Sequence, residues 1–255
     1  MFLADGNWRV EYYRVRVRQT TSEEAMDGVT QPAYDDRKAM MILLAVFVAV
    51  FAWSAIRPHD YFTWFLEVVP AIVGLAVLAA VYGRFRFTTL VYVVLLLHAI
   101  VLMVGGHYTY AEVPLGHWVQ DAFHLARNHY DRFGHFMQGF VPAMVAREVL
   151  VRQKVVKRKW LYFMVVAVCM MITSVYELFE FAVAKATGEA ADAFLGGQGD
   201  IWDTQWDMTM CFIGANTALV TLSRWHDRLI ARIDGRSDCS PLLPKSTEQD
   251  MATTR

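Results

Sequence analysis

Residues 87–111 read FTTLVYVVLLLHAIVLMVGGHYTYA and contain no Asp, Glu, Lys or Arg. A membrane-spanning helix needs about 20 predominantly apolar residues, so this stretch is long enough to cross a bilayer. Two earlier segments have the same character, because residues 39–56 carry no charge and residues 61–83 carry only Glu67. These three segments predict three transmembrane helices.

Three weaker apolar segments follow, at residues 133–146, 160–176 and 208–223. Each reaches the length of a full span only if ionisable residues at one end are included. The chain is 56% hydrophobic and only 19% charged, which is typical of a polytopic membrane protein and excludes a disordered chain. We therefore expect an all-α fold with six transmembrane helices.

Basic residues are distributed unevenly along this predicted topology. If the N-terminus is cytoplasmic, 20 of the 24 Lys and Arg residues lie on the cytoplasmic side. Because cytoplasmic loops carry the excess of basic residues, we expect both termini to be cytoplasmic. The predicted organisation is a polar cytoplasmic leader (1–38), a six-helix membrane domain (39–223) and a cytoplasmic tail (224–255), largely disordered beyond residue 235. The net charge of −1 argues against binding of nucleic acid, which normally needs a basic excess.

A row of polar side chains precedes and enters the fourth predicted span. Its members recur at alternating spacings of four and three residues, which places them on one face of a helix. They are His117, Asp121, His124, Asn128, Asp131, His135 and Gln138. The helix need not be continuous, because residues 128–130 or Gly134 can interrupt it. We expect an interfacial helix that starts after Pro114, and Asp131 near the N-terminus of the next helix, where the helix dipole favours an anion.

The fifth predicted span ends in a pair of acids. Glu177 and Glu180 are three residues apart and therefore share a helix face, with Thr173 one turn deeper. Two like charges on an apolar helix repel each other and are costly to bury. The pair therefore calls for a cation, a base or a shared proton.

A glycine-rich segment leads into the sixth predicted span. The residues GGQGD (196–200) are followed by Asp203 and Asp207, which share one helical face with Asp200. Gly214 lies two turns below Asp207 on roughly the same face. A small residue at that position permits close approach of another helix.

Spans four to six are consecutive and antiparallel, so we expect their acids and histidines to gather at the outer (periplasmic) side of the membrane. Carboxylate and imidazole groups suit a divalent ion such as Mg²⁺, Mn²⁺, Fe²⁺ or Zn²⁺, without selecting among them. The predicted metal ligands are Asp131, His135, Glu177, Glu180, Asp203 and Asp207. The predicted supporting residues are Asp121, His124, Asp200 and Gln138. Arg127 and Arg132 flank the polar row and are predicted to bind a phosphate group.

Other polar residues of the apolar segments receive simpler interpretations. Single acids such as Glu67 and Glu112 are typical of solvated positions near the ends of transmembrane helices. His98, inside the third predicted span, is interpreted as a packing histidine rather than a ligand. Cys169 and Cys211 lie in apolar runs without a pairing motif, so no disulfide is expected.

The same residues carry a resemblance to a known family. Four blocks resemble recurring blocks of the YjdF-like family of bacterial inner-membrane proteins: NHYDRFGHF (128–136), QGFVPA (138–143), YELFE (176–180) and GDIWDTQWDM (199–208). The resemblance extends from Ala39 to Leu229. It implies a multi-span protein of the bacterial inner (plasma) membrane, in contact with membrane lipid, and it implies no reaction. A looser resemblance, to the VanZ-like membrane proteins, rests on a sparse pattern of acids with one histidine and one glycine: Asp131, His135, Glu177, Glu180, Asp207 and Gly214.

Three hypotheses for the function remain open. The first is a metal site, open to the outer leaflet, that acts on a lipid-linked or phosphorylated head group. The second is a transporter or an ion or proton pathway that uses the same carboxylates. The third is a non-catalytic sensor or partner protein. The inner halves of the first three predicted spans are nearly all apolar, which favours a one-sided site over a pathway across the membrane.

Overall fold

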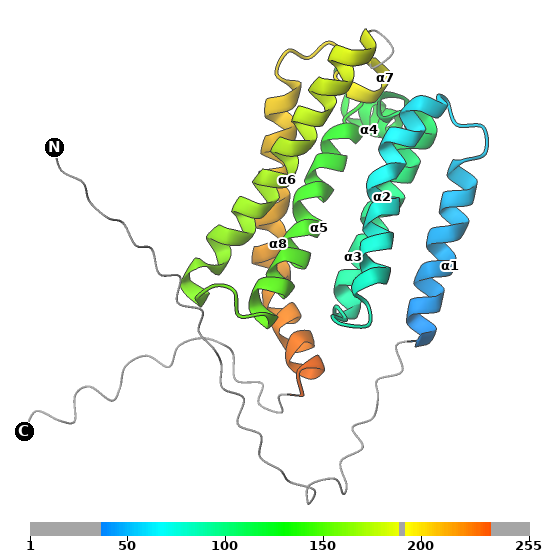
Figure 1. The fold of residues 1–255 in the computed structure, drawn as a ribbon. Coiled ribbons are helices and arrows are strands. Elements are labelled where there is room, and N and C mark those ends of the chain that lie inside the picture. The colour runs from blue at the N-terminus through cyan, green and yellow to red at the C-terminus, as the bar shows by residue number, and fades with distance from the viewer. Residues whose placement is uncertain (1–36, 189–191, 236–255) are drawn as a thin grey trace, which may run out of the picture. The chain divides into compact units, whose positions relative to one another are not determined.

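The computed structural model describes residues 37–188 and 192–235, and every regular element within these ranges is a helix (Figure 1). The elements are α1 (Arg37–Ser54), α2 (Tyr61–Val81), α3 (Thr89–Tyr108), the short 3₁₀ helix η1 (Tyr110–Glu112), α4 (Pro114–Phe123), α5 (Tyr130–Arg152), α6 (Arg158–Thr187), α7 (Asp192–Leu195) and α8 (Asp203–Ile233). Residues 1–36 of the predicted leader and the tail beyond residue 235 lie outside the described residues. The expected all-α fold is confirmed for the described part of the chain.

Four of the described helices, α1, α2, α3 and α6, are long and apolar enough to cross a membrane by length and composition. They correspond to the first, second, third and fifth predicted spans. The counterparts of the fourth and sixth are α5, with 23 residues, and α8, with 31 residues. At about 1.5 Å rise per residue, both are also long enough to cross a hydrocarbon core about 30 Å thick. The six-span topology stays a prediction, because α5 and α8 are more polar than the other four.

The polarity of α5 follows from its position in the bundle. This helix contacts α3, α6 and α8, so most of its circumference faces protein. Asp131 and His135 near its N-terminus and Arg147 and Glu148 near its C-terminus are all buried. Polar side chains on such a helix meet other helices rather than lipid, and they can therefore be tolerated in a transmembrane bundle.

Two glycines bring the backbones of α5 and α8 into direct contact. A Cβ atom on Gly139 of α5 would lie 1.9 Å from the carbonyl oxygen of Cys211, and one on Gly214 of α8 would lie 2.0 Å from that of Phe136. The expected close approach at Gly214 is confirmed. Because no side chain fits between the helices at these points, the register of α5 against α8 is tightly defined.

The connection between α4 and α5 determines where α5 begins. His124 adopts left-handed backbone angles (φ 53°, ψ 43°) and ends α4. The buried side chain of Asn128 then accepts a hydrogen bond from the Tyr130 amide and donates to the carbonyl groups of Ala111 and Val113. These bonds fix the start of α5 against the η1 segment. They place Asp131 in the first helical turn, where the helix dipole stabilises its charge.

A second group of buried polar residues lies at the opposite end of α5. The Glu148 carboxylate accepts hydrogen bonds from the amide and hydroxyl groups of Thr88 (2.9 and 2.7 Å), from Arg152 (2.8 Å) and from His226 Nε2 (2.8 Å). Both Glu148 oxygens are therefore paired. Such a saturated network joins α3, α5 and α8 structurally and leaves no polar group free for a ligand.

Candidate metal centre

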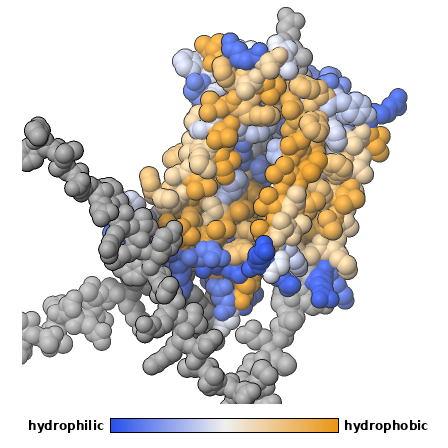
Figure 2. Space-filling model, in the orientation of Figure 1, coloured by the Kyte–Doolittle hydropathy of each residue, from blue (hydrophilic) through white to orange (hydrophobic). Residues whose placement is uncertain are grey.

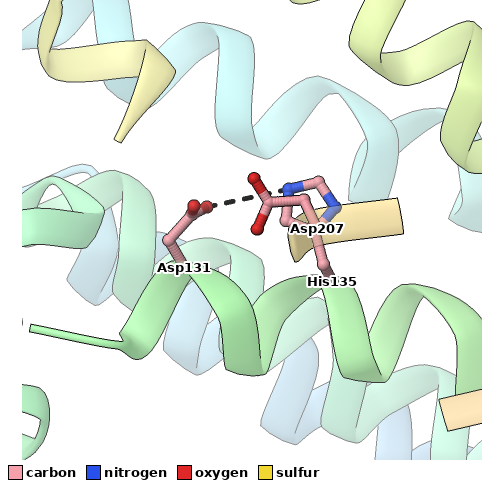
Figure 3. Close-up of side chains that lie close together, drawn as sticks. All are labelled: Asp131, His135 and Asp207. Atoms are coloured by element: carbon pink, nitrogen blue, oxygen red, sulfur yellow. Dashed lines mark ion pairs between the residues drawn. The ribbon is translucent and has the colours of Figure 1, made fainter. Parts of the chain in front are cut away.

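The end of the bundle that carries η1 and α7, here called the α7 end, contains three buried side chains that converge. Asp131 and His135 project from successive turns of α5 toward Asp207, which comes from the second turn of α8 (Figure 3). Their exposed fractions are 7%, 5% and 2%. One ligand atom of each lies within 4.8 Å of the others, which is close enough for a single ion to contact all three.

A further carboxylate, that of Glu177, approaches the other ring nitrogen of His135. Its Nε2 atom is 3.7 Å from Asp131 Oδ1, and its Nδ1 atom is 3.7 Å from Oε1 of Glu177 on α6. Both distances are too long for good hydrogen bonds. The imidazole therefore lies between two carboxylates without being hydrogen-bonded to either.

Several polar atoms of the centre have no hydrogen-bond partner among the described residues. They are Asp131 Oδ2, His135 Nδ1, Gln138 Oε1, Thr173 Oγ1, Glu177 Oε1 and Asp207 Oδ1. Burying a polar atom without a partner costs about 1–3 kcal/mol, and a charged one costs more. Both carboxylate oxygens of Glu148, in contrast, have hydrogen-bond partners. A divalent cation would satisfy the carboxylate oxygens and offset their mutual repulsion.

The donor set at this point fits such an ion. Two carboxylates and one imidazole, with the Glu177 carboxylate beside the other imidazole nitrogen, suit Mg²⁺, Mn²⁺, Fe²⁺ or Zn²⁺, and no thiolate lies among them. Asp131, His135, Glu177 and Asp207 are thus brought together by α5, α6 and α8. Gln138, one turn beyond His135 on α5, lines the adjacent cavity.

Glu180 belongs to this cavity rather than to the converging group, and a second acid accompanies it there. The cavity has a volume of about 800 Å³, and both Glu180 and Glu67 of α2 line it. Glu67 is only 2% exposed, so its interpretation as a solvated acid at a helix end is wrong. The signal that could have identified it was its position as the single charge of residues 61–83. His98, interpreted as a packing residue, also lines the cavity.

Two tyrosines absent from the sequence-based site accompany Glu67. Tyr110 and Tyr176 line the same cavity as Glu67. Tyr110 comes from η1 and Tyr176 from α6, so they approach Glu67 from separate elements. Aromatic residues near span ends usually indicate the membrane interface, and nothing in their spacing distinguished these two.

Asp203 belongs to an ion pair rather than to the converging group. Its Oδ1 atom accepts a hydrogen bond from Arg127 Nη1 at 2.8 Å, and Arg127 also donates to the carbonyl groups of Gly196 and Gly197, both at 2.9 Å. Asp200 is paired with Arg132 at 2.5 Å. The two arginines predicted to bind phosphate therefore hold the 196–203 loop over the N-terminus of α5.

This arginine-bound loop covers Asp131. A Cβ atom on Gly196 would lie 3.1 Å from the Asp131 carboxyl carbon and would press on the carboxylate, and the φ angle of +64° at this position also favours glycine. The Arg132 guanidinium stacks on the Trp206 ring, 5.1 Å from its centroid, and also contacts Nδ1 of His129 at 3.2 Å. Burial and the positive charges of Arg132 and Arg127 lower the pKa of His129. Its imidazole is therefore neutral at pH 7 and accepts the hydrogen bond.

The first part of the predicted polar row does not reach the centre. Asp121 and His124 are exposed, and His117 pairs with Glu112 through Nε2 at 3.2 Å. The row divides at His124, because the left-handed backbone there ends α4 and redirects the chain. The interfacial helix expected after Pro114 corresponds to α4, and it remains separate from α5.

Comparisons with known proteins agree with this description. The family described as predicted membrane protein (DUF2238) matches residues 39–228. The inner membrane protein YjdF of Escherichia coli (strain K12) is 48% identical over 184 residues, which are 72% of this chain and 88% of that relative. No solved structure matches the chain significantly. The looser resemblance to VanZ-like proteins stays a prediction.

Proposed function

The chain belongs to the DUF2238 family of predicted membrane proteins, and from that premise we propose that it holds a divalent metal ion between α5, α6 and α8 and acts there on a lipid-linked or phosphorylated head group. The proposed ligands are Asp131, His135, Glu177 and Asp207. The likeness to an inner membrane protein supports the same location for this chain. Membrane lipid is then its immediate surroundings.

The topology proposed with this function has six spans, α1, α2, α3, α5, α6 and α8, with both termini in the cytoplasm. The distribution of Lys and Arg supports it, because 20 of the 24 basic residues then lie on the cytoplasmic side. The α7 end of the bundle is then the outer side. The exposed apolar side chains of α1, α2 and α6 suit contact with lipid, as the orange surface in Figure 2 illustrates.

One observation carries the metal proposal: one ligand atom from each of the buried residues Asp131, His135 and Asp207 lies within 4.8 Å of the others, and each of these side chains also has a polar atom without a hydrogen-bond partner among the described residues. When bound there, a divalent ion can polarise a phosphoryl oxygen or lower the pKa of a coordinated water. The chain's own residues would supply the rest. Glu67 of α2 and Glu180 of α6, which both line the cavity, would accept or return a proton, and Tyr110 and Tyr176, which also line it, would orient Glu67.

Metal binding can be tested by equilibrium dialysis of chelator-treated protein against Mn²⁺. We expect one site per chain, with affinity reduced about 10–100-fold in Glu177→Gln and Asp207→Asn. The matched control is Glu112→Gln, because Glu112 is an exposed acid at the same end of the bundle and binding should be unchanged. Equal Mn²⁺ affinity in all four proteins would contradict the proposal.

The transport alternative would need a path from the metal centre across the membrane, and a second cavity lies next to the first. The cavity at the metal centre shares Pro70, His98 and Leu102 with a second cavity of about 290 Å³ among α1, α2 and α3. The lining of this second cavity is apolar apart from His98, Tyr82 and Tyr92, which does not suit a path for ions. Proton or Mn²⁺ flux into vesicles that contain the purified protein, abolished by Asp207→Asn, would favour transport over the head-group site.

A further inference from the structure

The cavity beside the metal centre combines an apolar wall with a polar floor. Its volume of about 800 Å³ falls within the range of about 300–1,000 Å³ that is usual for small-molecule sites. One wall comes from α2 and the other from α6, and Figure 2 shows a recess between two apolar ridges on this face of the molecule, with hydrophilic side chains at its bottom. The floor includes Asp131, His135 and Gln138 of α5.

The α7 end of this cavity is covered by protein. Phe194 of α7 is 2% exposed, and its ring packs edge-on against Phe179 of α6 at 6.1 Å. The helix α7 also contacts α2 and η1, so it bridges the two walls. The 196–203 loop, held by Arg127, covers Asp131 from the same side. A ligand in the surrounding water would have to displace these elements to enter.

The side of the cavity, in contrast, opens onto the apolar surface. Phe65 of α2 and Met171 and Val175 of α6 all line the cavity, yet they are 57%, 60% and 59% exposed. Within the proposed topology these exposed faces meet the hydrocarbon core. Large exposed apolar side chains around an entrance favour an apolar ligand, because they stabilise it without hydrogen bonds.

The floor determines which head group fits. The acids that line the cavity, Glu67, Asp131 and Glu180, would repel an anion. Arg127 and Arg132 are already paired with Asp203 and Asp200. A phosphate group could therefore approach only through a bound cation, to which the phosphate and the carboxylates would both be ligands. A hydrocarbon chain attached to that phosphate would lie between α2 and α6.

From this arrangement we infer that the ligand is a membrane lipid with a phosphate-bearing head group, which enters sideways from the bilayer between α2 and α6. The inference rests on the proposed metal function and adds the route and the class of substrate. The apolar cavity among α1, α2 and α3 lies next to this one, because Pro70, His98 and Leu102 line both.

The test compares dodecyl phosphate with inorganic phosphate as probes of the Mn²⁺-loaded protein in phosphatidylcholine nanodiscs, by calorimetric titration with empty nanodiscs subtracted. We expect saturable binding of dodecyl phosphate, about tenfold or more tighter than that of inorganic phosphate. Val175→Trp should narrow the entrance and weaken dodecyl phosphate binding by about tenfold, and Met171→Trp should act likewise. The control is Val220→Trp, because Val220 is 75% exposed on α8 and does not line the cavity.

The outcomes separate this inference from the metal proposal. Equal affinity for the two phosphates, or unchanged dodecyl phosphate binding in both entrance variants, would overturn sideways entry even if Mn²⁺ is bound normally. Dodecyl phosphate binding that depends on Val175 but not on Mn²⁺ or Asp207 would support the lipid cavity and overturn the metal site. The three tryptophan variants should retain the Mn²⁺ content of the wild type, since none of them alters a proposed ligand.

Discussion

His135 of α5 and Glu177 of α6 face each other with Nδ1 and Oε1 3.7 Å apart, and neither atom has a hydrogen-bond partner among the described residues. The same imidazole lies 3.7 Å from Asp131 through its other nitrogen. A histidine between two buried carboxylates can be explained by mutual ion pairing, or by a cation that binds one ring nitrogen and the carboxylate on that side. The unpaired state of the atoms favours the cation, because ion-paired groups at these depths normally close to hydrogen-bond distance.

Removal of one carboxylate should raise the thermal stability in the absence of metal and lower it, relative to the wild type, in the presence of metal. In the presence of a chelator, Asp207→Asn relieves repulsion by Asp131 and Glu177, so we expect it to melt higher than the wild type by about 2–4 °C for each 1 kcal/mol relieved. With Mn²⁺ at about 100 times its dissociation constant, the wild type should gain about 2.7 kcal/mol and become the more stable protein. Melting curves in a single detergent measure both. A variant less stable than the wild type under both conditions would indicate a purely structural Asp207.

The contact between α5 and α8 should be sensitive to a single methyl group. Gly139→Ala places a Cβ atom 1.9 Å from the Cys211 carbonyl oxygen, so the helices must separate. Overpacking of this kind costs about 1–3 kcal/mol, and the shift should also move Asp207 away from Asp131 and weaken Mn²⁺ binding. The control is Gly74→Ala on α2, where nothing lies within 4 Å of the added Cβ. Equal melting temperatures for the two variants would contradict the packing assignment.

Arg127 should stabilise the 196–203 loop rather than bind phosphate. Arg127→Gln removes the ion pair with Asp203 and the hydrogen bonds to Gly196 and Gly197, which leaves partly buried groups unpaired at a cost of about 1–3 kcal/mol. Amide hydrogen exchange in residues 196–203 should become faster. A double-mutant cycle with Asp203→Asn measures the coupling. Zero coupling, together with unchanged exchange, would indicate that the arginine is free to bind phosphate.

The neighbouring His129 predicts a pH dependence of stability. Its pKa is lowered by burial and by Arg132 and Arg127, so below about pH 6.5 the unfolded chain takes up a proton that the folded protein resists. Stability from this residue is therefore complete above the unfolded pKa and declines as the pH falls through it. His129→Gln should reduce the loss of unfolding free energy between about pH 7.5 and pH 5.5. An identical pH profile in both proteins would exclude this residue as a cause.

Helical spacing predicted which site residues share a helix face, but it did not predict their contacts with distant parts of the chain. Asp131 with His135 and Glu177 with Glu180 are separated by three or four residues, so local helix geometry places each pair on one face. The ion pair of Arg127 with Asp203 joins residues 76 positions apart and depends on a loop conformation that has no simple sequence pattern. The backbone reversal at His124 likewise separated Asp121 and His124 from α5.

Glu67 shows a different limitation of the sequence. A single acid in an apolar segment is equally compatible with a solvated helix end and with a buried site, and only the packing of α2 beside η1 and α6 distinguishes them. The structure buries Glu67 near Tyr110 and Tyr176, where it lines the cavity with Glu180. The apolar segments in α5 and α8 are short for a related reason, since polar residues of these helices face protein rather than lipid.

The most direct test of the central claim is the metal content of the protein purified from membranes without added metal, measured by elemental mass spectrometry. We expect about one divalent ion per chain in the wild type and in Glu112→Gln, and little or none in Asp207→Asn and His135→Ala. Equal metal content in all four proteins, or no metal in any well-folded sample even after reconstitution with Mn²⁺ or Zn²⁺, would contradict it.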